Sequence, residues 1–203
     1  MKPYYQDDYC TIYHGDCREI LPALPMVDLV LTDPPYGAGY AAHPVVGKWK
    51  SRSNHAAQDW DNVPADLASA LAAGESIIIW GGNYYALPLS RRWLVWIKRD
   101  APPSLSNCEL AWTNQDGNAR FFDWPIAATN AERIGHATQK PLALMKWCMG
   151  FAPDAQTILD PFMGSGTTLR AAKDLRRKCI GIEIEEKYCE IAVKRLRQEV
   201  LEL

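Results

Sequence analysis

The sequence predicts an α/β fold, with a mostly parallel, doubly wound sheet and helices on both faces. Apolar runs of strand length, such as residues 27–32 (VDLVLT) and 75–80, lack the polar alternation of half-exposed strands, which is typical of strands buried on both faces. Segments with helical patterning lie between such runs, as in a parallel sheet. The 203 residues suit one domain, 1–203, with neither a repeat nor a linker to divide it.

Strands and helices alternate in the first half of the chain. The expected strands are 11–16, 27–32, 75–80, 93–98 and 109–113, and the expected helices are 18–24 and 64–73. The second helix has Pro64 near its start and Gly74 just past its end, the usual positions of these residues. Residues 37–63 have no periodicity and predict a long loop, and loops of this length tend to be functional.

The second half continues the alternation after an irregular segment. Residues 114–135 contain scattered Gly, Asn, Asp and Pro and predict loops with at most a short strand at 120–123. Helices are expected at 141–151, 166–175 and from 185 to the end, with strands at 157–159 and 178–184. In the last helix, Tyr188, Ala192, Leu196 and Val200 form an apolar stripe at i+4 spacing.

Composition narrows the class of protein. Hydrophobic residues make up 48% and charged residues 23%, as in folded globular chains. No apolar run approaches the roughly 20 residues of a membrane span, and the first residues lack a secretory signal, so a cytoplasmic protein without membrane contact is expected. The net charge of −2 lacks the basic excess of many nucleic-acid binders, although an average hides local patches. The six cysteines form no C-x-x-C pair and predict reduced thiols and no metal site.

A glycine-rich turn, DPFMGSGTT at 160–168, follows a predicted strand and begins a helix. Its glycines let the backbone approach a ligand, and Glu183 at the end of the next strand can accept both hydroxyls of a ribose. The third glycine of a dinucleotide fingerprint is absent, and Thr167 stands where a phosphate-binding loop has lysine. The pattern therefore favours a nucleoside with an amino-acid-like tail, the alternative being a structural turn.

A second motif, Asp33-Pro34-Pro35-Tyr36, comes directly after the buried strand 27–32 and so lies at a carboxyl edge of the sheet, where open α/β sheets bind ligands. The prolines fix φ and remove two N–H donors, so the Asp33 carboxylate and the Pro34 carbonyl form a rigid pair of acceptors. Such a pair suits a substrate that offers an –NH2 group, and Tyr36 supplies a stacking face.

The exocyclic amine of adenine or cytosine is a poor nucleophile because its lone pair is delocalised into the ring. Two hydrogen bonds to fixed acceptors draw the nitrogen toward tetrahedral geometry and direct the lone pair at an incoming methyl group. Positioning and electrostatics would supply most of the rate, without a covalent intermediate.

Together these motifs resemble the β-type S-adenosylmethionine-dependent DNA amino-methyltransferases, the N6-adenine and N4-cytosine family. The motifs occur in the order GDC at 15–17, DPPY at 33–36, HATQKP at 136–141, DPFMGSGTT at 160–168 and GIE at 181–183. The tetrad before the cofactor loop resembles the permuted β-type order, and the resemblance covers roughly residues 11–37 and 93–200. It implies a Rossmann-like, class I methyltransferase fold.

The resemblance also assigns the tetrad and the glycine-rich turn. Asp33, Pro34 and Tyr36 are implied to be catalytic, with Pro35 completing the rigid turn. The cofactor, S-adenosyl-L-methionine, is expected to be wrapped by Asp160, Phe162, Gly164, Ser165, Gly166 and Thr167. No metal is implied.

The rest of the expected cofactor contacts come from three further segments. Glu183 would hold the ribose, and Asp16 would reach the adenine of the cofactor, with Cys17 beside it as a further expected cofactor contact. The remaining expected contacts, near the methionine end, are Thr138, Gln139 and Lys140. Lys140 would be the counter-charge of the cofactor carboxylate. Ala137 stands where the family usually has proline.

The partner implied by the resemblance is double-stranded DNA whose target base is flipped out of the duplex. The loop 37–63 interleaves basic residues with an aromatic one, which suits phosphate contact and stacking. The expected DNA contacts are Lys48, Trp49, Lys50 and Arg52. Outside the core motifs, only this loop and about 99–135 are left to recognise the target sequence. These recognition elements are therefore expected to be reduced, and the specificity for the target sequence is expected to be short or relaxed. A homodimer would suit a small subunit on a long duplex.

Alternative substrates remain open on the sequence. Asp at the first tetrad position favours adenine N6, as in a restriction-modification or phage-type methylase, with cytosine N4 methylation by the same site as the nearest rival. An RNA base or a protein glutamine amide also offers an –NH2 group, but the TQKP segment and the permuted order argue against these. A non-catalytic remnant is disfavoured by the intact tetrad and cofactor loop.

Overall fold

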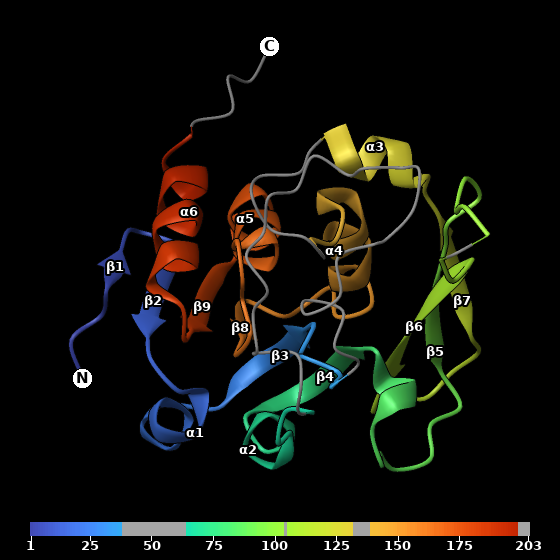
Figure 1. The fold of residues 1–203 in the computed structure, drawn as a ribbon. Helices are drawn as coiled ribbons and strands as arrows, with labels where there is room; N and C mark the ends of the chain where they lie inside the picture. The colour runs from blue at the N-terminus through green and yellow to red at the C-terminus, as the bar shows by residue number, and fades with distance from the viewer. Residues whose placement is uncertain (38–63, 104, 132–138, 199–203) are drawn as a thin grey trace.

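The computed structural model describes residues 1–37, 64–103, 105–131 and 139–198, which build one twisted sheet with flanking helices (Figure 1). The strands are β1 (Tyr5–Gln6), β2 (Cys10–His14), β3 (Val27–Thr32), β4 (Gly74–Trp80), β5 (Trp93–Ile97), β6 (Cys108–Thr113), β7 (Arg120–Asp123), β8 (Thr157–Asp160) and β9 (Lys178–Glu183). Their order in the sheet is β1-β2-β9-β8-β3-β4-β6-β5-β7.

The centre of the sheet is parallel. Strands β2, β9, β8, β3 and β4 run in one direction, with registers such as Leu29 opposite Ile158 and Val30 opposite Ile77. At one end β6 pairs antiparallel with β4 and β5, and β7 pairs parallel with β5, whereas β1 is antiparallel to β2 at the other end. After β3 the chain continues to β4 on one side, and after β8 it continues to β9 on the other side. The carboxyl ends of β3 and β8 therefore form a topological switch point, the place where α/β folds bind ligands.

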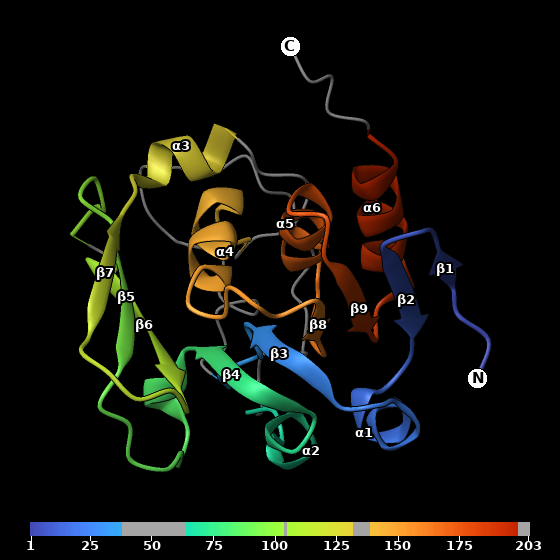
Figure 2. The same cartoon turned by 180° about the vertical axis from the view of Figure 1, so that it is seen from behind.

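Helices cover both faces of the sheet, as the sequence predicts (Figures 1 and 2). Helices α4 (Leu142–Met149), α5 (Thr167–Asp174) and α6 (Glu186–Arg197) lie on one face, and α1 (Cys17–Ile20), the 3-10 turn η1 (Leu21–Ala23) and α2 (Ala68–Leu71) on the other. Helix α3 (Ile126–Ala131) follows β7, and a second 3-10 turn, η3 (Gly82–Tyr84), follows β4. Within the described ranges no helix has the length and apolar character needed to cross a membrane.

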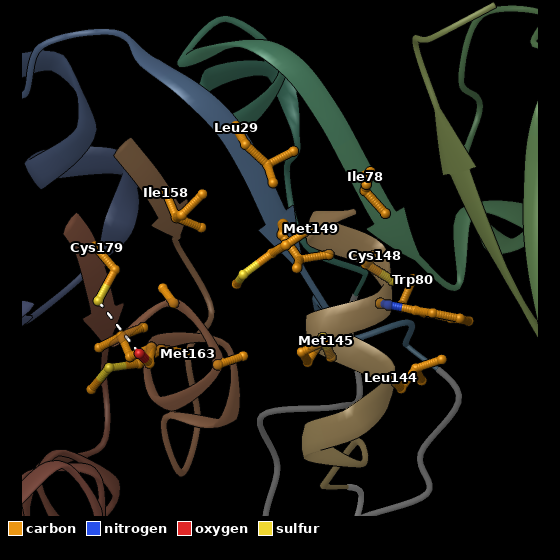
Figure 3. Packing of buried hydrophobic residues seen from close by; sticks show 14 of the residues in the cluster. Leu29, Ile78, Trp80, Leu144, Met145, Cys148, Met149, Ile158, Met163 and Cys179 are labelled. Carbon is orange, nitrogen blue, oxygen red and sulfur yellow. Dashed lines mark hydrogen bonds between the residues drawn. The ribbon is translucent and has the colours of Figure 1, made fainter. Parts of the chain in front are cut away.

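Two hydrophobic cores explain the uninterrupted apolar runs of the central strands. Leu29 of β3 and Ile78 of β4 belong to the core beneath α4, where Met149 packs against them (Figure 3). The next residue of each strand, Val30 or Ile79, belongs to the core on the α1 and α2 face. Because successive side chains of a strand point to opposite faces, both positions are buried and both are apolar.

Some predicted elements need correction. The helix expected at 64–73 contains only Ala68–Leu71, because Pro64 instead forms a β-bridge with Tyr36 and Asp66 accepts a hydrogen bond from the Ala68 N–H at the helix start. Helix α3 lies in a segment expected to be loop, and the Asp100 carboxylate accepts hydrogen bonds from its first N–H groups. Strand β1 was also not expected. The loop 37–63, apart from Gly37, and Val200 lie outside the described residues.

Candidate active site

The tetrad and the glycine-rich turn meet at the switch point of the sheet. Thr32, the last residue of β3, donates a hydrogen bond from Oγ1 to Oδ1 of Asp160, the last residue of β8, over 2.7 Å. The tetrad begins at Asp33, directly after Thr32, and the glycine-rich turn begins at Asp160 itself. Two motifs more than a hundred residues apart in the sequence therefore begin side by side. Because β3 and β8 are adjacent and parallel, their carboxyl ends are at the same edge.

Hydrogen bonds hold the tetrad in a fixed turn. The Tyr36 hydroxyl donates to Oδ1 of Asp33. The Pro35 carbonyl accepts from the Tyr85 hydroxyl and from the Ala65 N–H, the latter over 3.1 Å. The buried Pro34 carbonyl receives none of the hydrogen bonds found among the described residues. The Pro34 oxygen is therefore open to a further donor, whereas both Asp33 oxygens already accept hydrogen bonds, from Tyr36 and from Lys140.

The Tyr36 ring is positioned by the segment that follows β4. It stacks on the half-exposed ring of Tyr84, with centroids 4.9 Å apart and planes 14° from parallel. On another side it lies against Gly81, whose φ is +68° and where a Cβ would come within 2.0 Å of the Tyr36 ring. Burial, followed by the nearby Asp33 carboxylate, raises the pKa of Tyr36 well above 10.0, so the hydroxyl keeps its proton.

Lys140, expected near the methionine end of the cofactor, lies beside the tetrad. Its side chain is 5% exposed, and its ammonium lies 2.5 Å from Asp33 Oδ2 and 3.0 Å from Glu109 Oε2. The structure thus places the Lys140 ammonium at the tetrad, between two carboxylates of the chain. Burial raises the pKa of Asp33 above 3.8 even beside Lys140, while the two carboxylates hold the pKa of Lys140 well above 10.5.

The neighbouring Gln139 does reach the glycine-rich turn. Its Oε1 accepts a hydrogen bond from the Ser165 hydroxyl over 3.3 Å. Residues 139 and 140 therefore link the two motifs, one side chain to each. Thr138 lies outside the described residues.

The glycine-rich turn has the backbone shape that its sequence predicts. Gly164 and Gly166 have φ values of +49° and +75°. A Cβ on Gly166 would also come within 2.8 Å of the Ala192 Cβ on α6. Both the positive φ and the lack of space therefore favour glycine at this position. From α6, the buried Arg195 donates to the Thr167 hydroxyl over 2.7 Å and so fixes the start of α5.

Two carboxyl groups, one buried and one half-buried, line this turn. Asp160 is 3% exposed, and burial raises its pKa to about 6. Glu183, at the end of β9, accepts hydrogen bonds from the N–H groups of Gly164 and Glu185, both over 2.9 Å. Burial nevertheless raises its pKa to about 7. Neither carboxyl has a cation among the ion pairs of the described residues, so a ligand with hydroxyl donors or positive charge would stabilise the ionised forms.

The segment after β2 lies beside Glu183. The Gly15 N–H donates to the Glu183 carbonyl over 2.9 Å, which places Asp16 at the same sheet edge. Asp16 caps α1 by accepting from the Arg18 N–H and also pairs with the Arg18 side chain. Cys17 is 8% exposed and packs in the core on the α1 face, and burial raises the pKa of its thiol to about 11.

Several residues of the site were not expected from the sequence. These are Tyr84, Tyr85, Lys98, Glu109 and Arg195. Glu109 was the most accessible to prediction, since it is the single acid in the otherwise apolar strand 109–113. Lys98 is 10% exposed and pairs with Glu109. The expected DNA contacts Lys48, Trp49, Lys50 and Arg52 lie outside the described residues.

Comparison with known proteins gives a family match. The model of a family described as DNA methylase matches residues 90–194. The chain is 28% identical to the type II methyltransferase M.ScaI of Streptomyces caespitosus, over 100% of this chain and 86% of that protein. It is also 28% identical to M.HinfI of Haemophilus influenzae, over 98% and 71%.

Solved structures give the same architecture. The complex of M1.HpyAVI with SAM has a TM-score of 0.62 and 26% sequence identity, covering 92% of this chain and all of that one. The PvuII DNA methyltransferase, named as cytosine-N4-specific, has a TM-score of 0.63 over 98% of this chain and 90% of that one. At 17% identity, the second likeness concerns the fold alone.

Proposed function

This chain belongs to the DNA methylase family, and we propose that it methylates the N6 amino group of adenine in double-stranded DNA. It is a DNA amino-methyltransferase of the β type, with a class I methyltransferase fold, and its cofactor is S-adenosyl-L-methionine. The observation that carries the proposal is the position of the tetrad. The tetrad begins at Asp33, directly beside the glycine-rich turn, and the Thr32–Asp160 hydrogen bond joins the two motifs.

The residues of the glycine-rich turn fit this cofactor. S-adenosylmethionine carries two ribose hydroxyls and positive charge, which suit the carboxyl groups of Glu183 and Asp160. The left-handed backbone at Gly164 and Gly166 permits close approach of a ligand. We infer that these residues hold the cofactor together with Phe162, Ser165, Thr167 and Gln139, and that Asp16 contributes at the adenine end.

The tetrad would act by positioning. Asp33 and the Pro34 carbonyl accept hydrogen bonds from the substrate amine, and the Tyr36 ring stacks on the base. When bound, the cofactor supplies an electrophilic methyl group. To accept from the amine, Asp33 Oδ1 gives up the hydrogen bond from the Tyr36 hydroxyl, while Lys140 keeps Oδ2. Burial raises the pKa of Asp33, which makes its oxygens stronger acceptors than those of an exposed aspartate.

The proposal is tested by replacing Asp33. Asp33→Ala should lower methyl transfer to DNA at least about a hundredfold, because one fixed acceptor is lost, with cofactor affinity changed less than about threefold. Asp154→Ala, on an exposed turn, is the matched control and should behave as the wild type. Near-normal transfer by Asp33→Ala would refute the mechanism. Tritium transfer to separate DNA, RNA and protein pools tests the substrate class.

The base is identified by mass analysis of nucleosides from methylated DNA. We expect N6-methyladenine, because Asp at the first tetrad position favours adenine among β-type enzymes. N4-methylcytosine alone would show that the nearest alternative holds. We further propose that Lys48, Trp49, Lys50 and Arg52 contact the duplex, that the protein acts as a homodimer, and that it works in the cytoplasm.

A further inference from the structure

Four side chains of alternating charge form a row that begins at the tetrad. Asp33 Oδ2 lies 2.5 Å from the Lys140 ammonium, and Lys140 lies 3.0 Å from Glu109 Oε2. The other carboxylate oxygen of Glu109 pairs with the ammonium of Lys98. The row crosses four parts of the fold: the end of β3, the segment before α4, strand β6 and the end of β5.

The row is largely buried. The exposed fractions of the side chains are 5% for Lys140, 10% for Lys98, 20% for Asp33 and 26% for Glu109. The Lys98 ammonium also lies 4.9 Å from the centroid of the Trp96 ring. A buried charge that loses its partner is costly, and here each of the four charges has one of opposite sign beside it.

Lys140 has three N–H donors and three partners. It donates to Asp33 Oδ2 over 2.5 Å and to the Tyr36 hydroxyl over 3.4 Å. Its contact with Glu109 Oε2 is an ion pair without the alignment of a hydrogen bond. Asp33 and Glu109 therefore compete for one ammonium group, and Lys98 sets how strongly Glu109 competes.

We propose that Glu109, held by Lys98, is a positioning residue that shares the Lys140 ammonium with Asp33 and so keeps Asp33 a strong acceptor for the substrate amine. The inference rests on the proposed function for the identity of that amine. Among the residues that the structure describes, the charged and titratable groups that face Asp33 are Lys140, Tyr36 and Glu109, with Asp160 beyond Thr32. Of these groups, Glu109 is the one to which the proposed mechanism gives no other role.

The charges predict opposite effects of two substitutions. Without the Glu109 carboxylate, Lys140 pairs with Asp33 alone, and Asp33 loses a nearby negative charge, so its pKa falls. Without Lys98, Glu109 draws Lys140 more strongly, so the pKa of Asp33 rises. A role in folding alone would move neither value.

The first test titrates Asp33 directly in the ligand-free protein labelled with carbon-13 aspartate. The Asp33 signal is assigned by its loss in Asp33→Asn. Glu109→Gln should lower the midpoint by about half a pH unit or more, Lys98→Met should raise it by a similar amount, and the double variant should return it toward the wild-type value. Glu75→Gln and Lys146→Met, which make the same charge changes elsewhere, should leave it unmoved.

The second test measures the single-turnover rate of methyl transfer, which reports the chemical step. Glu109→Gln should lower this rate about tenfold at pH 8 and move the acid limb of its pH profile downward, with cofactor affinity unchanged within about twofold. Lys98→Met should move the acid limb upward. The same shifts in titration and in rate would support the inference.

Failure of the inference and failure of the proposed function give different results. If the wild type methylates DNA but neither substitution moves the Asp33 midpoint, or both move it in the same direction, the inference is wrong. If the wild type does not methylate DNA but the midpoints move in opposite directions, the charge row stands and the proposed function fails. The double variant guards against misfolding of either single variant, since its local charge is again balanced.

Discussion

Gly81 leaves the space into which the Tyr36 ring fits. Its φ of +68° disfavours a side chain, and a Cβ there would lie within 2.0 Å of Tyr36 Cε1. The ring would have to move off Tyr84, with which it stacks at 4.9 Å. At the scale of single residues, the site thus depends on the lack of a side chain at position 81 as well as on the tetrad itself.

Gly81→Ala should therefore lower methyl transfer at least about tenfold while cofactor affinity stays within about threefold, because Tyr36 is displaced and the glycine-rich turn is not. Steady-state kinetics and calorimetric titration with S-adenosylmethionine measure the two quantities. Gly150→Ala is the control, since Gly150 has a φ of −67° and should tolerate the methyl group. Wild-type activity in Gly81→Ala would contradict the placement of Tyr36.

We expect Glu183 to make cofactor binding depend on pH. Its pKa is raised from 4.5 to about 7 by burial, and we expect the ionised form to bind the ribose better. The dissociation constant should therefore rise about tenfold between pH 8 and pH 6 as the carboxylate takes up a proton. Glu183→Gln should bind more weakly and lose this dependence, whereas Glu190→Gln, on the exposed side of α6, should keep it. A flat profile in the wild type would contradict the assignment.

The same group affects stability without ligand. Because its pKa is raised on folding, the folded state binds the proton more tightly than the unfolded state. Its contribution to the free energy of unfolding is therefore largest below pH 4.5 and decreases as the pH rises through about 7.

At the scale of elements, hydrogen bonds of Asp28 join β3 to β8 at the end of the two strands that lies away from the site. Its Oδ2 accepts hydrogen bonds from the N–H groups of Gln156 and Thr157 and from the Thr157 hydroxyl, each over 2.8 Å. Its own N–H donates to the Thr157 hydroxyl over 2.9 Å. These bonds fix the register that brings Thr32 beside Asp160 at the other end.

Asp28→Asn should lower the free energy of unfolding by about 1–3 kcal/mol, because the charged acceptor of three hydrogen bonds is lost. Those bonds lower the pKa of Asp28 from 3.8, so its contribution is present above that pH and disappears as the pH falls through the folded-state pKa. Urea unfolding at pH 7 and pH 3 measures both effects. Asp154→Asn, on an exposed turn nearby, should change stability by less than about 0.5 kcal/mol. Equal stability of Asp28→Asn and the wild type at pH 7 would argue against this role.

At the scale of the whole molecule, most of the described chain is occupied by the sheet and its helices. The alignment with M.ScaI extends over 265 positions, more than the 203 residues of this chain, so that relative has additional residues between the matched ones. This supports the proposal that the recognition elements, in 37–63 and about 99–135, are reduced.

We therefore expect short or relaxed target specificity. DNA methylated by the purified protein, when sequenced for modified bases, should show a context of few fixed positions, because few residues are left to contact base edges. Discrimination over a long site by the monomer would count against a reduced recognition region. Light scattering with and without DNA establishes the oligomeric state in the same samples.

The sequence by itself determined the parallel sheet, the tetrad and the glycine-rich turn. These are local patterns: an apolar run such as 27–32 is buried on both faces, prolines 34 and 35 fix their own φ, and Gly164 and Gly166 take backbone angles that other residues disfavour. The strand β7 was predicted with its bounds, whereas α3 was not, since Asp100 caps it from outside its own sequence.

Only the tertiary structure decided which charges meet. Lys140, Glu109 and Lys98 lie on separate segments, and no spacing in the sequence indicates that they form one row ending at Asp33. The motif containing Lys140 suggested a ligand contact, and the antiparallel placement of β6 beside β4 and β5 puts Glu109 beside Lys140 as well. Electrostatic partners depend on distance in space, which strand order determines, whereas backbone conformation depends on neighbours in the chain.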